Sequence, residues 1–522
     1  MKKNTILILI LGLLILSCKK KDSLRWNVDM LAPVVYGDLT INDIINDTLW
    51  SANTDSSVQL NFTSTLYSLN FDSIVAIPDT TIKEDHLVPF SAGITFNPGQ
   101  TFVTQTNDVS LDVNDIELTE VIIKEGNIKY KISSNIDAEI IYTYKINNAF
   151  DAQGNPFSKE ITVPPSGSSN AVLTGTFSLA NYRIDLTGAN GTSYNRLSTN
   201  VEMTLSPNNP TSVLINNQDT VHTENTLTGL KVEYAKGYFG NRVISVPAET
   251  SSIKALSHFI SGTIDLEQIN IDFKIINGIG ADASFTINEM TSIKGTNEVG
   301  LTHNLIGNLT NISRASLSGS TVMPSVFNSS ITSSNSNIEP WLENLPDSVR
   351  YAMDLELNPL GDVSGHNDFI YNSSPFKVQM GVNMPLSLLA NNLTLLDTIN
   401  LSTEKLEQVI EGKLNIEIDN GFPLNATLSL QPIAGGNELT SNTTIDAGVL
   451  DNGTQKVTSS SHSSHTITLT DTDIEALKTD GRAKLKLVFN TPTSASIPIK
   501  IYDYYHLKFS VVTDFTYTNK ID

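Results

Sequence analysis

Alternation of apolar and polar residues is the feature of this chain that most constrains its fold. Apolar residues recur at every second position through most of the sequence, as in IKYKISSNIDAEIIYTY from Ile128. Turn-forming clusters such as Asn97-Pro98-Gly99 and Asp451-Asn452-Gly453 interrupt the alternation at short intervals. A period of two places apolar side chains on one face of a β-strand, and closely spaced turn signals are typical of sandwiches and barrels. The sequence therefore predicts an all-β fold of several β-sandwich or curved-sheet modules in tandem, with few short helices.

Helical periodicity is restricted to two short segments. In NIEPWLENLPDSV we expect Asn337 to cap a helix of one or two turns that Pro346 closes. In DTDIEALKTDG, Thr472 and Glu475 have the spacing of a capping box, and Gly481 is expected to end the helix. Neither segment is long enough to change the predicted fold class.

An internal repeat underlies the prediction of several modules. Three seventeen-residue segments align without gaps and begin at Ile128, Ile271 and Leu414, so consecutive copies start 143 residues apart. One position interrupts the apolar alternation with a polar side chain in each copy: Ser134, Asn277 and Asn420. The next position carries a residue type that tolerates positive φ: Asn135, Gly278 and Gly421. Similarity at a fixed period indicates three related β modules.

The Asn420-Gly421 pair resembles a hairpin turn, but a two-residue turn fails on register. It would pair Glu417 with Leu424 and so mix charged and apolar residues on one face. Three alternatives keep that face apolar: a three-residue loop that pairs Ile418 with Phe422, a bulged continuous strand, and an arch from one sheet of a sandwich to the other. Each of them bends the chain at this point.

The N-terminus has the three parts of an export signal. Two lysines precede an apolar run from Ile6 to Leu16, which is short for a permanent transmembrane helix. The segment Ile15-Leu16-Ser17-Cys18 resembles the lipobox of bacterial lipoproteins, and Cys18 is the only cysteine of the chain. The resemblance implies cleavage after residue 17 and lipidation of Cys18, so the acyl chain would be the membrane anchor.

Several stretches resemble uncharacterised lipoproteins of Bacteroidota. These are the lysine-rich start after Cys18, WNVDMLAPVVYGDLTINDII, SLANYRIDLTGANGTSYNRLS, GYFGNRV from Gly237 and MPLSLLANNLTLLDTINL. The repeated segments resemble the V-x-N-x-G corner of immunoglobulin-like and late-embryogenesis-abundant-like (LEA-like) modules. The resemblance implies a location at the outer membrane, on its periplasmic face or at the cell surface, and carries no activity.

The expected organisation combines these signals. Residues 1–17 are a lipoprotein signal peptide and 18–45 a tether with an N-terminal segment. Residues 46–255 hold one or more β modules, 256–400 a further module and 401–522 a C-terminal module.

A short pattern, Asp followed by Ser or Thr and then an aliphatic residue or Thr, resembles the O-glycosylation site of exported Bacteroidota proteins. The candidate acceptors are Ser23, Thr48, Ser73, Thr80, Thr220, Ser348 and Thr398. Sugars at these positions would solubilise turns and shield strand edges.

Charge disfavours a nucleic-acid partner. The formal net charge is −22, and such a negative chain repels phosphate backbones. A hydrophobic content of 39% is enough to fill β cores, so the composition does not indicate disorder.

A search for catalytic and metal-binding patterns identifies no catalytic residue and no cofactor site. His462 and His465 in SSSHSSH could present two imidazoles to a metal, but a polar loop or strand edge is the favoured interpretation. Two clusters of acidic residues could coordinate calcium: Asp112 with Asn114 and Asp115, and Asp471 with Asp473. Roles in turns and helix caps are the favoured interpretation for both clusters.

Aromatic residues are expected in cores. Trp26, Trp50 and Trp341 could stack on sugars, yet core or edge packing is the favoured interpretation. The C-terminal stretch has one apolar parity, which predicts a core-facing strand: Tyr505, Leu507, Phe509, Val511, Phe515 and Tyr517.

Together these features predict a lipid-anchored, non-enzymatic envelope protein with a role in binding, adhesion or assembly. Its partner would be an envelope protein, glycan or lipid. The alternative is a carrier that holds a lipid or other hydrophobic ligand in an apolar β-sheet cavity. A polysaccharide-active enzyme is the third alternative, for which the sequence offers no catalytic pair.

Overall fold

The computed structural model describes residues 24–45, 47–87, 91–113, 115–253, 259–400, 409–440, 444–451, 453–492 and 497–521. Within these ranges the chain is mostly β-strand, with three short α-helices: α2 (Ile41–Ile44), α3 (Ile338–Glu343) and α4 (Asp471–Thr479). The predicted all-β, multi-sheet fold class is therefore confirmed. The described helices include none long and apolar enough to cross a bilayer.

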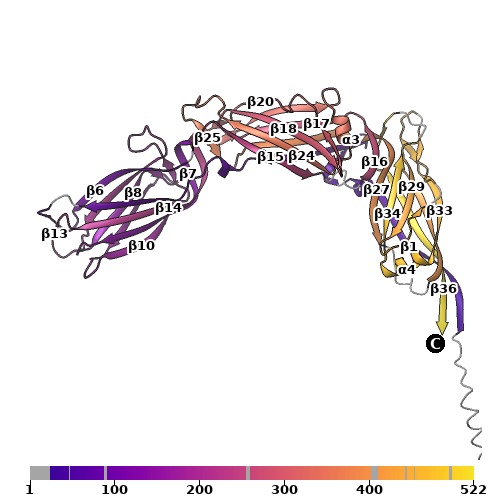
Figure 1. Cartoon of the computed structure of the whole chain (residues 1–522), viewed down its shortest axis with the longest axis horizontal. Coiled ribbons are helices and arrows are strands. Elements are labelled where there is room, and N and C mark those ends of the chain that lie inside the picture. The colour runs from indigo at the N-terminus through magenta and orange to yellow at the C-terminus, as the bar shows by residue number, and fades with distance from the viewer. Residues whose placement is uncertain are drawn as a thin grey trace, which may run out of the picture.

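The strands form three lobes that follow one another in a bent row (Figure 1). We call them the terminal, middle and distal lobes. The terminal lobe contains a four-stranded sheet, β1 (Leu24–Thr40), β36 (His506–Ile521), β28 (Val409–Asn420) and β33 (Ser461–Leu469). Its second sheet is β16 (Phe259–Leu266), β27 (Ser387–Asn400), β34 (Arg482–Asn490), β29 (Asn425–Pro432) and β30 (Leu439–Thr440), with β35 (Ile499–Lys500) beside β27. A hairpin of β31 (Val449–Leu450) and β32 (Val457–Ser459) lies between β30 and β33 in the sequence.

The middle lobe also has two main sheets. One is β2 (Trp50–Ala52), β3 (Val58–Ser68), β26 (Lys377–Pro385), β17 (Asn270–Asn277) and β23 (Ser325–Thr332). The other is β15 (Arg242–Ser252), β24 (Ser348–Leu357), β18 (Ala283–Lys294) and β19 (Asn297–Gly300), with β20 (Leu309–Ile312) on β18. Short elements complete this part of the chain: η2 (Asp47–Leu49), η3 (Phe71–Ser73), β21 (Ser316–Ser318) and β22 (Thr321–Met323).

The distal lobe is one wrapped sheet. Its main strands are β14 (Thr220–Tyr238), β7 (Glu117–Ser134), β11 (Arg183–Asp185), β8 (Ile140–Phe150), β12 (Arg196–Leu205) and β6 (Thr101–Ser110). Three more strands add to it, β4 (Thr80–Leu87) on β14, β10 (Ala171–Ser178) on β7 and β9 (Pro156–Val163) on β8. A small two-stranded sheet of β5 (Ile94–Phe96) and β13 (Val213–Ile215) lies at the far end (Figure 1).

The lobes are nested in the chain instead of consecutive. Strand β1 belongs to the terminal lobe, β2 and β3 to the middle lobe, and β4 to β14 to the distal lobe, after which the chain returns to the middle lobe with β15 and to the terminal lobe with β16. Strands β17 to β24 and β26 then complete the middle lobe, with β25 on the distal sheet between them, and the strands from β27 onward complete the terminal lobe. The ranges 46–255, 256–400 and 401–522 expected from the sequence therefore do not coincide with the sheets. Local alternation specifies which face of a strand is buried, but it does not specify the partner strand.

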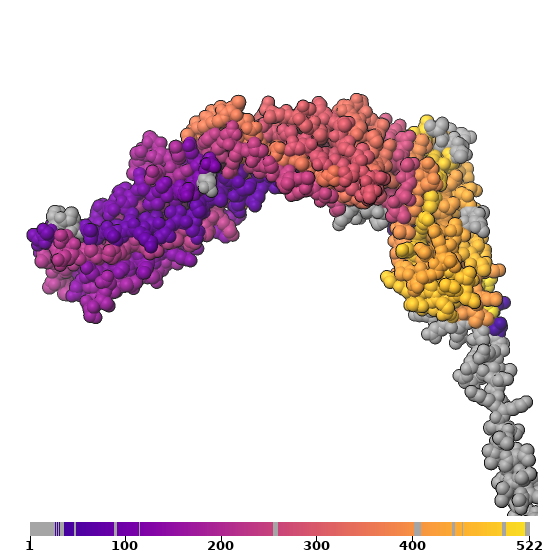
Figure 2. Space-filling view, viewed as in Figure 1, coloured from indigo at the N-terminus to yellow at the C-terminus, as the bar shows by residue number. Residues whose placement is uncertain are grey.

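The pairing of β1 with β36 brings the two ends of the described chain together. The ladder is antiparallel and runs from Leu24 opposite Ile521 to Thr40 opposite His506. Figure 2 shows indigo N-terminal atoms beside yellow C-terminal atoms at the free end of the terminal lobe. Residues 24–40, predicted to belong to the tether and N-terminal segment, thus form an edge strand of the last sheet.

The three repeated segments occupy equivalent places in the three lobes. Each consists of a strand, a sharp corner and the next strand: β7 to β8, β17 to β18, and β28 to β29. In the middle and terminal lobes the second strand lies in the other sheet of the same lobe. Of the three alternatives for Asn420-Gly421, the arch is therefore confirmed.

A buried polar side chain forms the same contact at every corner. The side-chain oxygens of Ser134, Asn277 and Asn420 accept hydrogen bonds from the backbone N–H two residues later, at 3.2, 2.9 and 2.9 Å. All three residues are almost fully buried. Such a turn lets the backbone change direction inside the core without leaving that N–H unpaired.

The corner glycines have a different role from the expected one. Neither Gly278 nor Gly421 is among the positive-φ residues. A Cβ on Gly278 would lie 2.1 Å from the Ser374 carbonyl oxygen, and one on Gly421 would lie 2.8 Å from the His506 carbonyl oxygen. Glycine is required here because a neighbouring backbone approaches closely, which apolar periodicity does not reveal.

Both predicted helices exist, with altered caps. Helix α4 begins two residues earlier than expected, so its capping box is Thr470 with Asp473 instead of Thr472 with Glu475. Asn337 occupies the N-cap position of α3 but makes no side-chain cap bond. Its side chain instead accepts from the Thr302 N–H and donates to the Gly300 carbonyl.

The predicted core face of the last strand is confirmed for the side chains that the structure describes, which do not include Tyr517. Tyr505, Leu507, Val511 and Phe515 are buried, and Phe509 packs against the same core.

Candidate functional site

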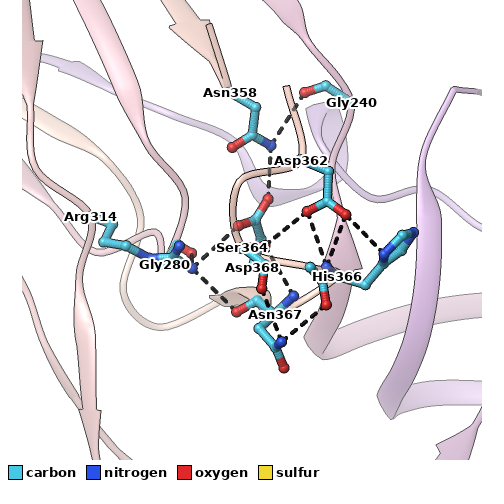
Figure 3. A network of polar contacts seen from close by, with 10 residues as sticks. Gly240, Gly280, Arg314, Asn358, Asp362, Ser364, His366, Asn367 and Asp368 are labelled. Atoms are coloured by element: carbon cyan, nitrogen blue, oxygen red, sulfur yellow. Dashed lines mark hydrogen bonds and ion pairs between the residues drawn. The ribbon is translucent and has the colours of Figure 1, made fainter. Parts of the chain in front are cut away.

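The joint between the middle and distal lobes contains a network of buried and charged polar contacts around a histidine. Between β24 and β26 the chain leaves the middle lobe and forms β25 (Asp368–Tyr371), which pairs antiparallel with β14 of the distal lobe. The preceding loop, residues 358–367, contains two residues with positive φ that are not glycine, Asn358 and His366. The loop and β25 thus cross the joint as a single brace (Figure 3).

His366 connects the two lobes. Its Nε2 forms a hydrogen bond with Glu117 at the start of β7, and its Nδ1 lies 2.9 Å from Asp362 within the loop. The imidazole stacks on Tyr194, with ring centroids 5.7 Å apart, and meets the edge of Tyr238. Two carboxylates and two aromatic rings from both lobes therefore fix this side chain.

Asp368 is the buried charge of the joint (Figure 3). Its carboxylate lies 3.2 Å from Nη2 of Arg314 and accepts a hydrogen bond from Nδ2 of Asn358 at 2.8 Å. Burial raises the pKa of Asp368. Arg314 also donates to the carbonyls of Gly280 and Asn367, so this guanidinium ties the loop to the corner of β17 and β18.

The polar side chains of the joint are engaged in contacts that connect the loop with the two lobes. The Ser364 hydroxyl donates to Asp362 at 3.1 Å and accepts from the Asn367 N–H at 3.0 Å, so both of its roles are taken within the loop. His366 has an acid on each nitrogen and so makes no contact with this hydroxyl. A serine activated by a histidine requires a direct hydrogen bond between the two. The arrangement is suited to holding two lobes together.

The two histidines of SSSHSSH do not converge. His462 is an exposed residue of β33 that contacts Asp419 at 2.8 Å and Glu417 at 3.2 Å, and its hydrogen bond to Asp419 raises its pKa. His465, three residues on, is buried, and burial lowers its pKa. Residues three apart on a strand face opposite sides of the sheet, so the two imidazoles cannot share one metal ion.

Among the acidic residues considered for calcium, Asp473 has a structural role. Asp473 is fully buried, completes the cap of α4 and accepts from the Asn437 N–H at 2.9 Å. Asp471 lies in the first turn of α4. Asn114 lies outside the described residues, and Asp112 and Asp115 flank it.

The tryptophans do not form a sugar platform in the described structure. Trp341 is 1% exposed within α3, and its indole nitrogen has no hydrogen-bond partner. Trp50 donates to Asn42 at 3.0 Å and packs on the core. Trp26 lies on β1. Core and edge packing, the favoured interpretation, is confirmed for Trp341 and Trp50.

One apolar cavity lies where the middle and terminal lobes meet. Its walls come from α2, α3 and strands of both lobes, including Ile45, Phe62, Trp341 and Leu388, and its volume is about 80 Å³. Pockets that hold a small ligand measure roughly 300–1,000 Å³. This cavity is therefore too small for a lipid.

The candidate modification sites lie in different settings. Thr48, Ser73 and Thr398 are exposed, whereas Thr80, Thr220 and Ser348 are partly exposed first residues of strands. Cys18 and Ser23 lie outside the described residues, as does the signal peptide.

The residues of the joint were missed by sequence reasoning. The run NPLGDVSGHND, residues 358–368, has the composition of a loop, and its Gly and Asp content gives no indication that it joins two lobes. The distance of 249 residues between Glu117 and His366 leaves no local pattern to detect.

Comparisons with known proteins do not assign a family. No family model matches the chain, and no curated protein matches it. Among solved structures, a secreted protein of Parabacteroides distasonis aligns at 10% identity over 52% of this chain and 82% of its own, with a TM-score of 0.23. An archaeal-virus protein with a triple jelly roll aligns at 12% identity over 85% and 91%, with a TM-score of 0.10. The infectious bursal disease virus VP2 subviral particle aligns at 8% identity over 92% and 86%, with a TM-score of 0.12. We draw no functional argument from alignments at these TM-scores.

Proposed function

We propose that this chain is a non-enzymatic, lipid-anchored envelope protein that holds its distal lobe away from the membrane for binding, adhesion or assembly. The observation that carries the proposal is the nesting of the lobes. The described chain begins at Leu24 and ends at Ile521, side by side at the free end of the terminal lobe. Leu24 is six positions after Cys18, so a lipid on Cys18 would hold that end at the bilayer.

The nested path then determines which lobe projects. The chain passes out through the middle lobe, builds the distal lobe with residues 80–238, and returns (Figure 1). A tether at the terminal lobe therefore leaves the distal lobe as the part farthest from the anchor. Two exposed apolar side chains near the small sheet of β5 and β13, Leu87 at 54% and Leu214 at 59%, suit contact with an external partner.

The carrier alternative is weaker, because the apolar cavity of about 80 Å³ is well below ligand size. Among the described side chains, Trp341 is buried and Trp50 packs on the core, so neither supports a sugar-binding cleft of a polysaccharide-active enzyme.

Metabolic labelling tests the anchor. Cells that express the chain are grown with a palmitate analogue, and we expect label on the wild type and none on Cys18→Ala. Label that persists on Cys18→Ala would contradict the proposal. Capture of envelope partners by the wild type, compared with a variant in which Leu87 and Leu214 are both replaced by Ser, then tests the binding role of the distal lobe.

A further inference from the structure

The middle lobe has a cleft that the proposed display function does not use. It measures about 590 Å³ and lies between β3 of one sheet and the end of β15 in the other. Its floor is apolar, with Phe62, Leu66, Val349 and Met380. This volume falls within the range of small-ligand pockets.

The rim of the cleft presents polar side chains that have no partner. Five of them make no side-chain hydrogen bond to the described part of the chain: Asn61, Thr63, Ser64, Ser251 and Ser252. Acidic and basic side chains are absent from the described lining, although the chain as a whole carries a net charge of −22. The cleft therefore favours an uncharged ligand that forms several hydrogen bonds.

Backbone groups of β3 also face the cleft. The Val58 carbonyl accepts from Leu386 N–H beyond the end of β26, and the Ser57 carbonyl accepts from Asn53 N–H on the side of β2. Alternate residues of a strand direct their N–H and C=O to opposite sides, so Asn61 and Thr63 face the same side as Ser57. Strand β2 pairs only with residues 58–60 of β3, so the described sheets place no strand beside Asn61 and Thr63. The short helix η2, which precedes β2, contributes Thr48 and Leu49 to this end of the cleft.

Strand β15, across the cleft, also has an edge without a partner strand in the described sheets. Ile253 N–H donates to the Asp347 carbonyl, so Ile253 and Ser251 face β24 and Ser252 faces away from it. The described residues place no strand on that side of β15. The cleft is thus bordered by two strand edges whose outward backbone donors and acceptors have no partner strand among the described residues.

We propose that this cleft binds a short, uncharged, extended peptide segment of a partner protein, which adds to the edge of β3. Open strand edges recognise peptides through main-chain hydrogen bonds, while adjacent pockets take alternate side chains. Residues 61–66 span about 20 Å in a strand, which matches a segment of about six residues. A sugar would use the rim hydroxyls and would leave the backbone edge without a partner.

Selection of binding peptides tests this site on the intact chain. Phage that display random nonapeptides without Asp, Glu, Lys or Arg are selected on the wild type. We expect enriched clones whose synthetic peptides protect the amides of Asn61 and Thr63 from hydrogen exchange. Absence of enrichment, or protection of these amides by cellohexaose but not by any peptide, would overturn the proposal.

Two variants and a control locate the contact. Thr63→Pro removes an N–H that faces the cleft and spares the ladder to β26, so it should weaken peptide binding about fivefold or more. Asn61→Trp obstructs the rim and should also weaken binding, and it provides the test if Thr63→Pro fails to fold. Asn328→Trp, exposed on β23 of the same sheet and outside the cleft, should leave binding unchanged. Equal binding by the wild type and Asn61→Trp would contradict the proposal.

Discussion

At the scale of single residues, the three corners are held by buried polar side chains. Asn420 accepts from Phe422 N–H and donates from Nδ2 to the carbonyls of Leu424 and Asp446, at 2.8 and 2.9 Å. Ser134, at the equivalent corner, contributes one such bond, to Ile136. The same corner therefore depends on its polar residue to different degrees in different lobes.

Replacement of these residues should have graded effects on stability. Asn420→Ala removes the side-chain partner of two buried backbone groups and one partly buried carbonyl, so we expect a loss of about 2–4 kcal/mol in the free energy of unfolding. Ser134→Ala should cost about 1 kcal/mol, because one N–H loses its partner. Denaturant unfolding measures both values, and equal losses would contradict this role for Asn420.

The corner glycines should also be sensitive to substitution. Gly278→Ala places a Cβ 2.1 Å from a carbonyl oxygen, so we expect a loss of more than about 2 kcal/mol. Gly300 is a matched control, because a Cβ there meets no atom within 4 Å and its φ is not positive. Gly300→Ala should change stability by less than about 0.5 kcal/mol. Similar thermal melts of the two variants would show that the close approach at Gly278 is unimportant.

His462 and His465 should give opposite pH dependences. Burial lowers the folded-state pKa of His465, so the unfolded chain binds its proton more readily and stability is lost as pH falls through about 6.5. The hydrogen bond to Asp419 raises the folded-state pKa of His462, so its stabilisation is present at low pH and is lost as pH rises through that pKa. Between pH 5 and 8 the melting curves of both variants should therefore diverge from the wild type at the acidic end, in opposite directions. As pH falls, His465→Gln should gain stability relative to the wild type and His462→Gln should lose it.

At the scale of elements, the loop 358–367 and β25 brace two lobes. His366→Ala removes the contacts with Glu117 and Asp362, so we expect β25 amides to exchange about tenfold faster while the cores of the lobes stay protected. His222, which contacts Asp85 on the exposed face of the distal lobe, is the matched control. Unchanged exchange in β25 of His366→Ala, or an equal effect of His222→Ala, would argue against the brace.

The elements also show what the sequence can predict. The alternation of apolar and polar residues was sufficient to predict the strands and the three bends at a constant spacing. Which face of a strand is buried depends on the local sequence alone. The α4 cap was displaced because Thr470 and Asp473 have the same spacing as Thr472 and Glu475, and only the fold shows that Ile474 and Leu477 must be buried. The joint was not predictable, since Glu117, His366 and Arg314 come from segments that meet only after folding.

At the scale of the whole molecule, β1 and β36 close the path of the chain. Strand partners hundreds of residues apart leave no trace in periodicity, so neither the nesting nor the position of the N-terminal strand follows from the sequence. The fold nevertheless determines which lobe lies farthest from the two ends of the described chain. Both ends of the described chain lie at the terminal lobe, and the distal lobe is formed at the farthest point of the path (Figure 1).

Depth-dependent fluorescence quenching on liposomes most directly tests which lobe of the anchored protein lies nearest to the membrane. Cys18 is the only cysteine, so its acylation leaves introduced thiols as the sole labelling sites. Dyes are placed at Ser168→Cys, beside the distal corner, and at Glu475→Cys in α4 at the free end of the terminal lobe. With a quencher on the lipid headgroups, we predict strong quenching at position 475 and little at 168. Equal quenching at the two positions, or stronger quenching at 168, would contradict display of the distal lobe by a lipid at the terminal lobe.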